Sequence, residues 1–393
     1  QLFTMRRLFM KFKKLLAVLL AGVLTLGILG ASVTSAEEAV ESPVAGKKIA
    51  YIMLMTPATI FQMWSDSFTA TAEALGMTAD TFFCSESAET WQDTIAQCAA
   101  SGYDGLMVSH GGQEYAWQYL SDILAQYPDL KIVTFDTPFK DANGEVAKID
   151  GVTQFFQQDA GFAAGLVEAL MALPENAEKV AAGEPLNILQ VQQGAGYNSP
   201  FDRRQVGYQP YVDEGKIVTV ERIAPSNDQM ATASMRDVTT ATLAKYTDDQ
   251  IDGIWCCYDA YAQGVYQSLA ENGRNIPMVS VDICNEDIQF MQEPGSQWKA
   301  CATTNWELNG EFACRVLALE LAGDYAAIEA APCYYPEIGA WMEIPSTIVT
   351  QEQVTQDIGE PITIENLYKV ADPSYSDTSW MPTCDWMIAI LGR

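Results

Sequence analysis

The chain has 393 residues, of which 49% are hydrophobic, so it is long enough for two domains with separate cores and too apolar to be disordered. Acidic residues number 51 against 22 basic ones, which gives a formal net charge of −29. This balance excludes nucleic acid as a partner, because a surface that binds phosphates needs an excess of Lys and Arg.

Metal and cofactor chemistry has little support in the sequence. The nine cysteines include no CxxC pair, which argues against zinc-ribbon and thioredoxin sites, and His110 is the only histidine. Most cysteines lie in apolar patterns and are expected to be small core residues, although Cys284 and Cys301 follow segments that are expected to be neighbours and could pair. We expect no metal, no other cofactor and no catalytic residues.

Residues 1–36 have the pattern of an export signal. Five basic residues precede an apolar run over 15–31, and small residues follow at 34–36, where a signal peptidase would cut. A retained membrane anchor is the alternative, because the run approaches the shortest length that spans a bilayer. We expect residues 1–36 to be removed and residues 37–46 to form a short linker.

Short apolar runs alternate with segments of helical periodicity from residue 48 onward. In the first half, the predicted strands cover residues 49–55, 78–84, 105–109 and 131–135, and the predicted helices cover 61–75, 91–100 and 115–125. This order requires a parallel sheet with helices on both faces, so the predicted fold class is α/β, doubly wound.

The second half of the chain repeats the pattern from a predicted strand at 186–191. The runs 131–136 and 277–282 both end on an aspartate and occupy corresponding places in the two halves. Chance similarity is the alternative, because buried parallel strands look alike. We expect two related lobes, with the chain crossing between them around 154–159 and Asp159 capping the next helix.

The aspartates at these strand ends, Asp136 and Asp282, are candidate ligand contacts, because ligands of doubly wound sheets bind beyond the carboxyl ends of the strands. An ionised carboxylate accepts hydrogen bonds from neighbouring hydroxyls of a sugar. Each could instead cap a helix or fix a turn, but their matching positions favour a ligand. Two carboxylates also permit glycoside hydrolysis, and a secreted carbohydrate-active hydrolase is therefore the alternative of another class.

Aromatic residues gather at the same predicted strand ends, namely Phe61, Trp64, Tyr258 and Trp306. The apolar C–H face of a sugar ring stacks on such side chains, whereas core packing is the alternative for each of them. Tyr197 lies in a glycine-containing loop after a predicted strand and is expected to line a ligand cleft at these strand ends, with a plain structural turn as the alternative. The favoured interpretation of His110 is a solvated loop histidine, with ligand contact as the alternative.

These segments together resemble the type I periplasmic binding proteins, in particular the ribose-binding-like branch that serves bacterial ABC importers. The resemblance spans residues 47–350 and rests on the runs 48–52, 132–136, 202–208, 258–264 and 276–282 in this order. It implies two Rossmann-like lobes with parallel sheets, joined by three crossings of the chain, that clamp a ligand by hinge closure. The expected first lobe comprises 47–153 and 305–340, the second 154–304 and 341–350, and residues 351–393 are expected to wrap the lobes.

Residue by residue, the resemblance assigns ligand contacts to Phe61, Asp136 and Asp282. The arginine with which the family often grips its ligand aligns nearer Asp202, and Arg203 beside it is the candidate. No cysteine closes the signal where a lipoprotein of this family would have one, so a protein of the periplasm or the bacterial cell surface without a lipid anchor is expected.

The resemblance implies a monomeric solute-binding protein, not an enzyme, that captures a small neutral sugar or polyol for the membrane permease of an ABC importer. Binding of a nucleoside, or of a furanosyl signal molecule such as autoinducer-2, is the alternative ligand class. The sequence does not separate an importer partner from a chemosensory receptor.

Overall fold

The computed structural model describes residues 40–335 and 341–393. The expected export signal lies outside the described residues, as does the beginning of the expected linker. The chain from Val40 to Arg393 forms one compact unit. Every helix in the described ranges is too short or too polar to cross a bilayer.

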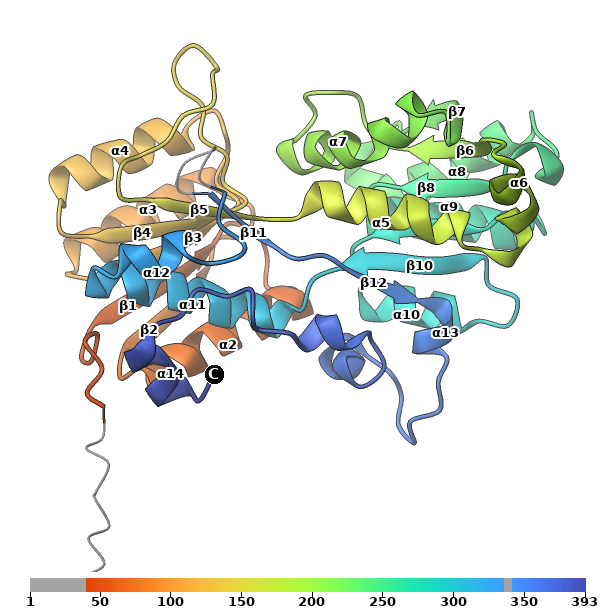
Figure 1. The fold of residues 1–393 in the computed structure, drawn as a ribbon. Helices are drawn as coiled ribbons and strands as arrows, with labels where there is room; N and C mark the ends of the chain where they lie inside the picture. The colour runs from red at the N-terminus through yellow and green to blue at the C-terminus, as the bar shows by residue number, and fades with distance from the viewer. Residues whose placement is uncertain (1–39, 336–340) are drawn as a thin grey trace, which may run out of the picture. The chain divides into compact units, whose positions relative to one another are not determined.

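Two six-stranded sheets organise this unit (Figure 1). The first sheet is parallel throughout and has the order β11 (Trp341–Ile344), β5 (Thr153–Gln157), β4 (Lys131–Phe135), β3 (Gly105–Ser109), β1 (Lys48–Met53), β2 (Thr78–Phe83). The second has the order β12 (Thr347–Thr350), β10 (Trp298–Thr303), β9 (Met278–Val281), β8 (Gly253–Cys256), β6 (Leu186–Val191), β7 (Ile217–Ile223). Only β12 runs antiparallel, against β10. The predicted fold class of two doubly wound α/β lobes is confirmed.

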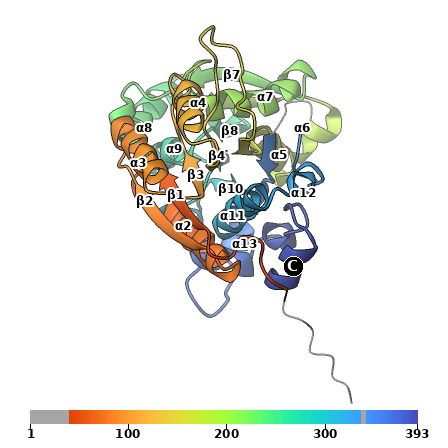
Figure 2. The ribbon, with the colours of Figure 1, turned by 90° about the vertical axis from the view of Figure 1, so that its left-hand side faces the viewer.

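Helices cover both faces of the first sheet because its strands are apolar on both sides. In β1, Ile49, Tyr51 and Met53 face one core, whereas Ala50 and Ile52 face the other. The first of these cores includes α2 (Thr59–Ala74), α11 (Trp306–Ala322) and α12 (Tyr325–Glu329), and the second includes α3 (Ala88–Ala100) and α4 (Ala116–Gln126), as Figures 1 and 2 show.

The second sheet shares one core cluster with its helices. These helices are α5 (Asp159–Met171), α6 (Ala177–Ala182), α7 (Ser199–Asp213), α8 (Ala231–Leu243), α9 (Asp259–Glu271), α10 (Asn285–Gln292) and α13 (Gln351–Val354). Beyond α13, residues 362–375 pack against this second core, and α14 (Asp385–Leu391) packs against the first lobe.

Among the helix pairs that approach so closely that the contact position must be glycine are α2 with α11 and α5 with α7. A Cβ atom on Gly310 of α11 would lie 2.2 Å from the carbonyl oxygen of Trp64 in α2, and one on Gly207 of α7 would lie 1.9 Å from that of Ala160 in α5. Both distances are far below van der Waals contact, so any side chain there would force the helices apart. Close packing therefore explains the glycine in the run 202–208.

The lobe boundaries differ from the expected ones in two places. The strand β5 pairs with β4, so the first lobe continues to Gln157 instead of ending at residue 153. The strand β11 also belongs to the first sheet, and only β12 joins the second. The sequence Thr153–Gln157 has two apolar residues between polar ones and resembled a linker, yet all five residues are buried. The chain thus crosses between the lobes after β5, after β10 and between β11 and β12.

All nine cysteines are free, and seven of them are buried. The Cys284–Cys301 pairing that the sequence allowed is therefore wrong. The thiol of Cys301 lies 3.4 Å from the hydroxyl of Ser280 and 3.7 Å from the sulfur of Met291 inside the second core.

Candidate ligand-binding site

A pocket of about 750 Å³ lies at the carboxyl ends of the strands and is lined by residues of both lobes. Six of the eight residues proposed from the sequence line it, namely Phe61, Asp136, Tyr197, Tyr258, Asp282 and Trp306. The sheet topology explains why Asp136 and Asp282 meet at the pocket, because β4 and β9 are inner strands of their sheets and these aspartates directly follow them.

Trp64 does not line the pocket. Its side chain is fully buried in the first core, where its ring lies edge-on to Phe135 with centroids 4.4 Å apart. On α2, Phe61 lies at the pocket while Trp64, one turn further, faces the sheet. The core-packing alternative holds for Trp64.

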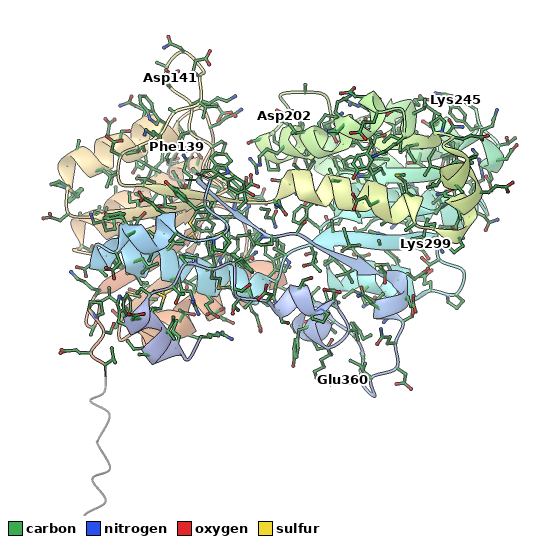
Figure 3. The ribbon with its side chains drawn as sticks, in the orientation of Figure 1. Phe139, Asp141, Asp202, Lys245, Lys299 and Glu360 are labelled. Carbon is green, nitrogen blue, oxygen red and sulfur yellow. The ribbon has the colours of Figure 1, made fainter. Side chains whose placement is uncertain are left out.

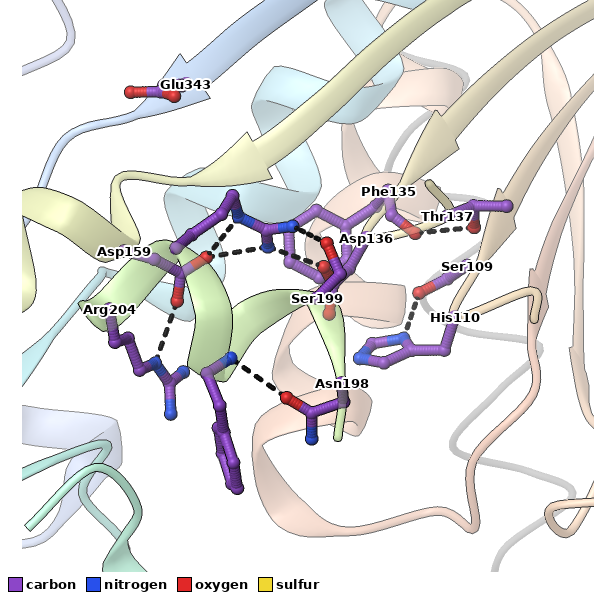
Figure 4. Close-up of polar contacts among 12 residues, drawn as sticks. Ser109, His110, Phe135, Asp136, Thr137, Asp159, Asn198, Ser199, Arg204 and Glu343 are labelled. Atoms are coloured by element: carbon purple, nitrogen blue, oxygen red, sulfur yellow. Dashed lines mark hydrogen bonds and ion pairs between the residues drawn. The ribbon is translucent and has the colours of Figure 1, made fainter. Parts of the chain in front are cut away.

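Arg203 does not line the pocket either, although it is hydrogen-bonded to Asp136, which does. Its Nη2 atom donates to Asp136 Oδ1 at 2.8 Å, and its Nε atom donates to Asp159 Oδ2 at 2.8 Å (Figure 4). Its Nη1 atom donates to Ser199 Oγ at 2.6 Å, and its guanidinium lies 4.5 Å from the ring centroid of Phe156. Arg203 therefore links the second lobe to the aspartate of the first.

The neighbouring Arg204 makes the matching contacts on the second lobe. It donates from Nε to Asp159 Oδ1 at 2.8 Å and from Nη2 to Asp282 Oδ2 at 3.4 Å, and it lines the pocket. Both pocket aspartates are thus joined through one chain of charges, Asp136–Arg203–Asp159–Arg204–Asp282. Asp159 is 1% exposed and lies at its centre, so the expectation that it caps α5 is wrong.

The two pocket carboxyls differ in their pKa values. Burial acts to raise the pKa of Asp136, but the charges of Arg203, His110 and Arg204, together with the hydrogen bond from Arg203, outweigh it, so the pKa lies below its ordinary value. Burial also raises the pKa of Asp282, and Arg204 opposes this only in part, so that pKa lies above its ordinary value. Asp136 is therefore the firmer anion of the two.

Unusual backbone geometry sets the direction of three side chains at the pocket edge. His110, Asp136 and Asp282 each follow a strand and have φ angles of 60°, 42° and 69°, in the left-handed region that is costly for residues with a Cβ. The sheets hold them there: the Asp136 N–H donates to Phe155 O at 3.0 Å and the Asp282 N–H to Ala302 O at 2.8 Å. Strain of this kind is common in ligand sites.

His110 lines the pocket, so its favoured interpretation as a solvated loop residue was wrong. Its Nδ1 atom is hydrogen-bonded to Ser109 Oγ. Its ring lies edge-on to the rings of Phe61 and Phe135, at centroid distances of 5.5 Å and 5.4 Å. Burial lowers its pKa below the ordinary value, while Asp136 opposes the shift. A neutral imidazole thus faces the pocket at neutral pH.

Sequence reasoning also missed Arg204, Phe201 and Tyr261, which all line the pocket. The Phe201 ring stacks on Tyr197 at 5.7 Å and meets Tyr261 at 5.9 Å. Helical periodicity could have found the first two, because Phe201, Arg204 and Tyr208 are buried positions of α7 at spacings of three and four, whereas Arg203 lies beside that stripe.

One group of side chains has the atom types of a metal site. The ligand atoms of Asp259, Cys284 and Asp287 lie within 4.8 Å of one another. Burial raises the pKa of all three groups, that of Asp287 to about 6, and a metal ion would bind only their deprotonated forms. The expectation of no metal stays a prediction.

Comparisons with known proteins agree with this architecture. The model of the periplasmic binding protein domain family matches residues 49–324, whereas no curated protein matches. The sugar ABC transporter structure from Yersinia enterocolitica subsp. enterocolitica 8081 is 25% identical with a TM-score of 0.65, covering 90% of this chain and 98% of that one. The 5-methylthioribose transporter solute binding protein from Thermotoga lettingae TMO is 19% identical with a TM-score of 0.66, covering 88% and 98%. The periplasmic ribose ABC transporter from Conexibacter woesei DSM 14684 is 14% identical with a TM-score of 0.62, covering 84% and 98%.

Two doubly wound lobes with three crossings and a pocket at their strand ends define a type I periplasmic binding protein, as the resemblance to the ribose-binding-like branch implied. The chain belongs to the periplasmic binding protein domain family, since the family model covers well over half of its length. It is a binding protein and not an enzyme.

Proposed function

We propose that this protein is the extracytoplasmic solute-binding component of an ABC importer and that it captures a small neutral sugar or polyol in the pocket between its lobes. The observation that carries the proposal is that Asp136 of the first lobe and Asp282 of the second line one pocket, which has aromatic side chains on both walls. The sugar-transporter relatives named above support the same ligand class.

The chemistry of the pocket suits hydroxyl groups. Asp136 and Asp282 accept hydrogen bonds, Arg204 donates them, and the neutral His110 offers its second ring nitrogen. The wall residues Phe61 and Trp306 of the first lobe and Tyr197 and Tyr258 of the second supply faces for the C–H surface of a sugar ring. Binding to both lobes at once favours their closure, because only the closed form gives the ligand all of these contacts.

The three crossings of the chain form the hinge about which the lobes close. The Gln158 N–H donates to Ile344 O at 2.9 Å, so two of these segments are bonded to one another. The arrangement resembles a hinge whose axis runs through the crossings, while the charge chain around Asp159 lies next to it. Closure about this hinge, with a permease in the membrane as partner and a monomeric protein outside the cytoplasm, belongs to the proposal.

A nucleoside or a substituted furanose is the second candidate ligand. The pocket volume of about 750 Å³ and the four aromatic side chains Tyr197, Phe201, Tyr258 and Tyr261 of the second lobe leave room for a ring attached to a sugar. One structural relative was solved in complex with 5-methylthioribose, a furanose that carries an apolar substituent.

A thermal-shift screen tests the proposal. The chain from Glu37 onward is purified, refolded to remove carried ligand, and heated with pentoses, hexoses, polyols, nucleosides, 5-methylthioribose and amino acids. A ligand that binds only the folded protein raises the melting temperature with its concentration. We expect a dose-dependent rise with one sugar or polyol. A rise only with nucleosides moves the assignment to the second candidate, and a rise only with amino acids contradicts both.

A further inference from the structure

The C-terminal residues 361–393, which we call the strap, lie beyond the segment that the family model matches. Their first part is anchored in the second lobe through η4 (Ile364–Lys369) and η5 (Pro373–Ser376). The anchoring residues are buried in the second core and are Ile362, Ile364, Leu367, Val370 and Tyr375. The strap therefore begins as an integral part of the second lobe.

The strap then crosses to the first lobe. Met381 and Met387 are buried in the first core, and Trp380 packs on Phe312 of α11 with ring centroids 5.1 Å apart. The Trp386 indole N–H donates to Asp324 Oδ2 at 2.7 Å. This fourth connection between the lobes is the dark blue segment that leads to α14 in Figure 1.

The segment between the two anchors is short. Only residues 376–379 separate Tyr375 from Trp380, and most of them are exposed. The Cα atoms of Tyr375 and Trp380 can be at most about 18 Å apart when the chain between them is fully extended. Separation of the lobes at the strap is limited to that reach unless an anchor leaves its core.

The strap also belongs to the pocket. Ile364 lines the pocket, and its N–H donates to Oδ1 of the pocket residue Asn285 at 2.8 Å. At the other end, Asn305 Nδ2 donates to the carbonyl oxygen of Tyr375 at 3.0 Å, while its Oδ1 caps α11 just before the pocket residue Trp306. The strap therefore contacts the pocket residue Asn285 directly and the pocket residue Trp306 through its neighbour Asn305.

We propose that the strap is a component of the ligand-binding apparatus, which limits how far the lobes open and supplies Ile364 as a wall of the pocket. Fewer open conformations leave a larger fraction of the protein competent to close on ligand, so the strap raises affinity. The effect on opening is independent of the ligand, whereas the effect on affinity rests on the proposed function.

The opening is tested by lengthening the strap without removing its anchors. A flexible Gly/Ser insert of about twelve residues between Asp377 and Thr378 adds a reach of roughly 19 Å. The matched control carries the same insert between Asn143 and Gly144, in the exposed loop of Asp141 that projects from the first lobe (Figure 3). Small-angle X-ray scattering of the ligand-free proteins should give a larger radius of gyration for the strap insert. Equal radii would overturn the proposal.

The pocket wall is tested with two isoleucines of the same core. Ile362 and Ile364 are 6% and 3% exposed, but only Ile364 lines the pocket. We expect Ile362→Ala and Ile364→Ala to lower the melting temperature alike, while only Ile364→Ala weakens binding of the sugar with the largest thermal shift, by about threefold or more. Equal affinities of the two variants contradict the role of Ile364. If no sugar binds, the proposed function fails, and the scattering result still decides whether the strap limits opening.

Discussion

Asp159→Asn should destabilise the protein more than any other single neutralisation of an aspartate in the charge chain. Asp159 is 1% exposed and accepts hydrogen bonds from both arginines, at 2.8 Å from Arg203 Nε and 2.8 Å from Arg204 Nε. Asparagine keeps the shape but removes the charge, so the two buried guanidiniums keep only Asp136 and Asp282 as charged partners among the described residues. Breaking a buried pair in this way costs about 3–5 kcal/mol.

Urea unfolding followed by circular dichroism measures this loss. The matched control is Asp202→Asn on the same helix as the two arginines, because Asp202 accepts only the N–H of Gly196, at 2.9 Å, and makes no ion pair among the described residues (Figure 3). We expect the control to lose less than about 1 kcal/mol. If Asp159→Asn unfolds at the same urea concentration as the control, the charge chain does not hold the lobes as described.

Two further changes test buried features away from the pocket. Burial raises the pKa of Glu320 to about 8, so the unfolded chain ionises first and native stability falls as pH rises from about 4.5 to 8. Glu320→Gln should therefore have a higher free energy of unfolding than the wild type at the upper end of that range, by at most about 5 kcal/mol, as chemical unfolding at several pH values measures. The exposed control Glu329→Gln should leave the free energy of unfolding nearly unchanged. Gly207→Ala should lower the free energy of unfolding by at least about 2 kcal/mol in chemical unfolding, because its Cβ would lie 1.9 Å from Ala160 O. The control Gly194→Ala should be nearly neutral, because a Cβ there would have no neighbour within 4 Å. Similar losses in both variants would show that α5 and α7 are not in close contact.

The sequence predicted the α/β architecture well because buried parallel strands and amphipathic helices leave strong periodic signals. It predicted Asp136 and Asp282 because topology, not packing detail, brings the strand ends together. It failed at β5, whose three polar residues are buried and interrupt the apolar pattern, and at β11, which has only four residues with Glu343 among them.

Neighbouring side chains on one helix were harder to separate. Arg203 and Arg204 differ by 100° around α7, and only the buried stripe of Phe201 and Tyr208 shows which of them faces the pocket. The position of His110 could not be read from composition at all, because a left-handed φ of 60° and burial against Phe61 turn it inward. Contacts that depend on backbone strain have no sequence pattern.

The central claim is that Asp136 and Asp282 bind the ligand from opposite lobes. Isothermal titration of the sugar found in the thermal-shift screen, with Asp136→Ala, Asp282→Ala and the Asp202→Ala control, tests it most directly. We predict that each of the first two variants stays folded and loses about 1.5–3 kcal/mol of binding free energy, roughly tenfold to hundredfold in Kd, while the control binds like the wild type. Unchanged affinity in both pocket variants would contradict the account.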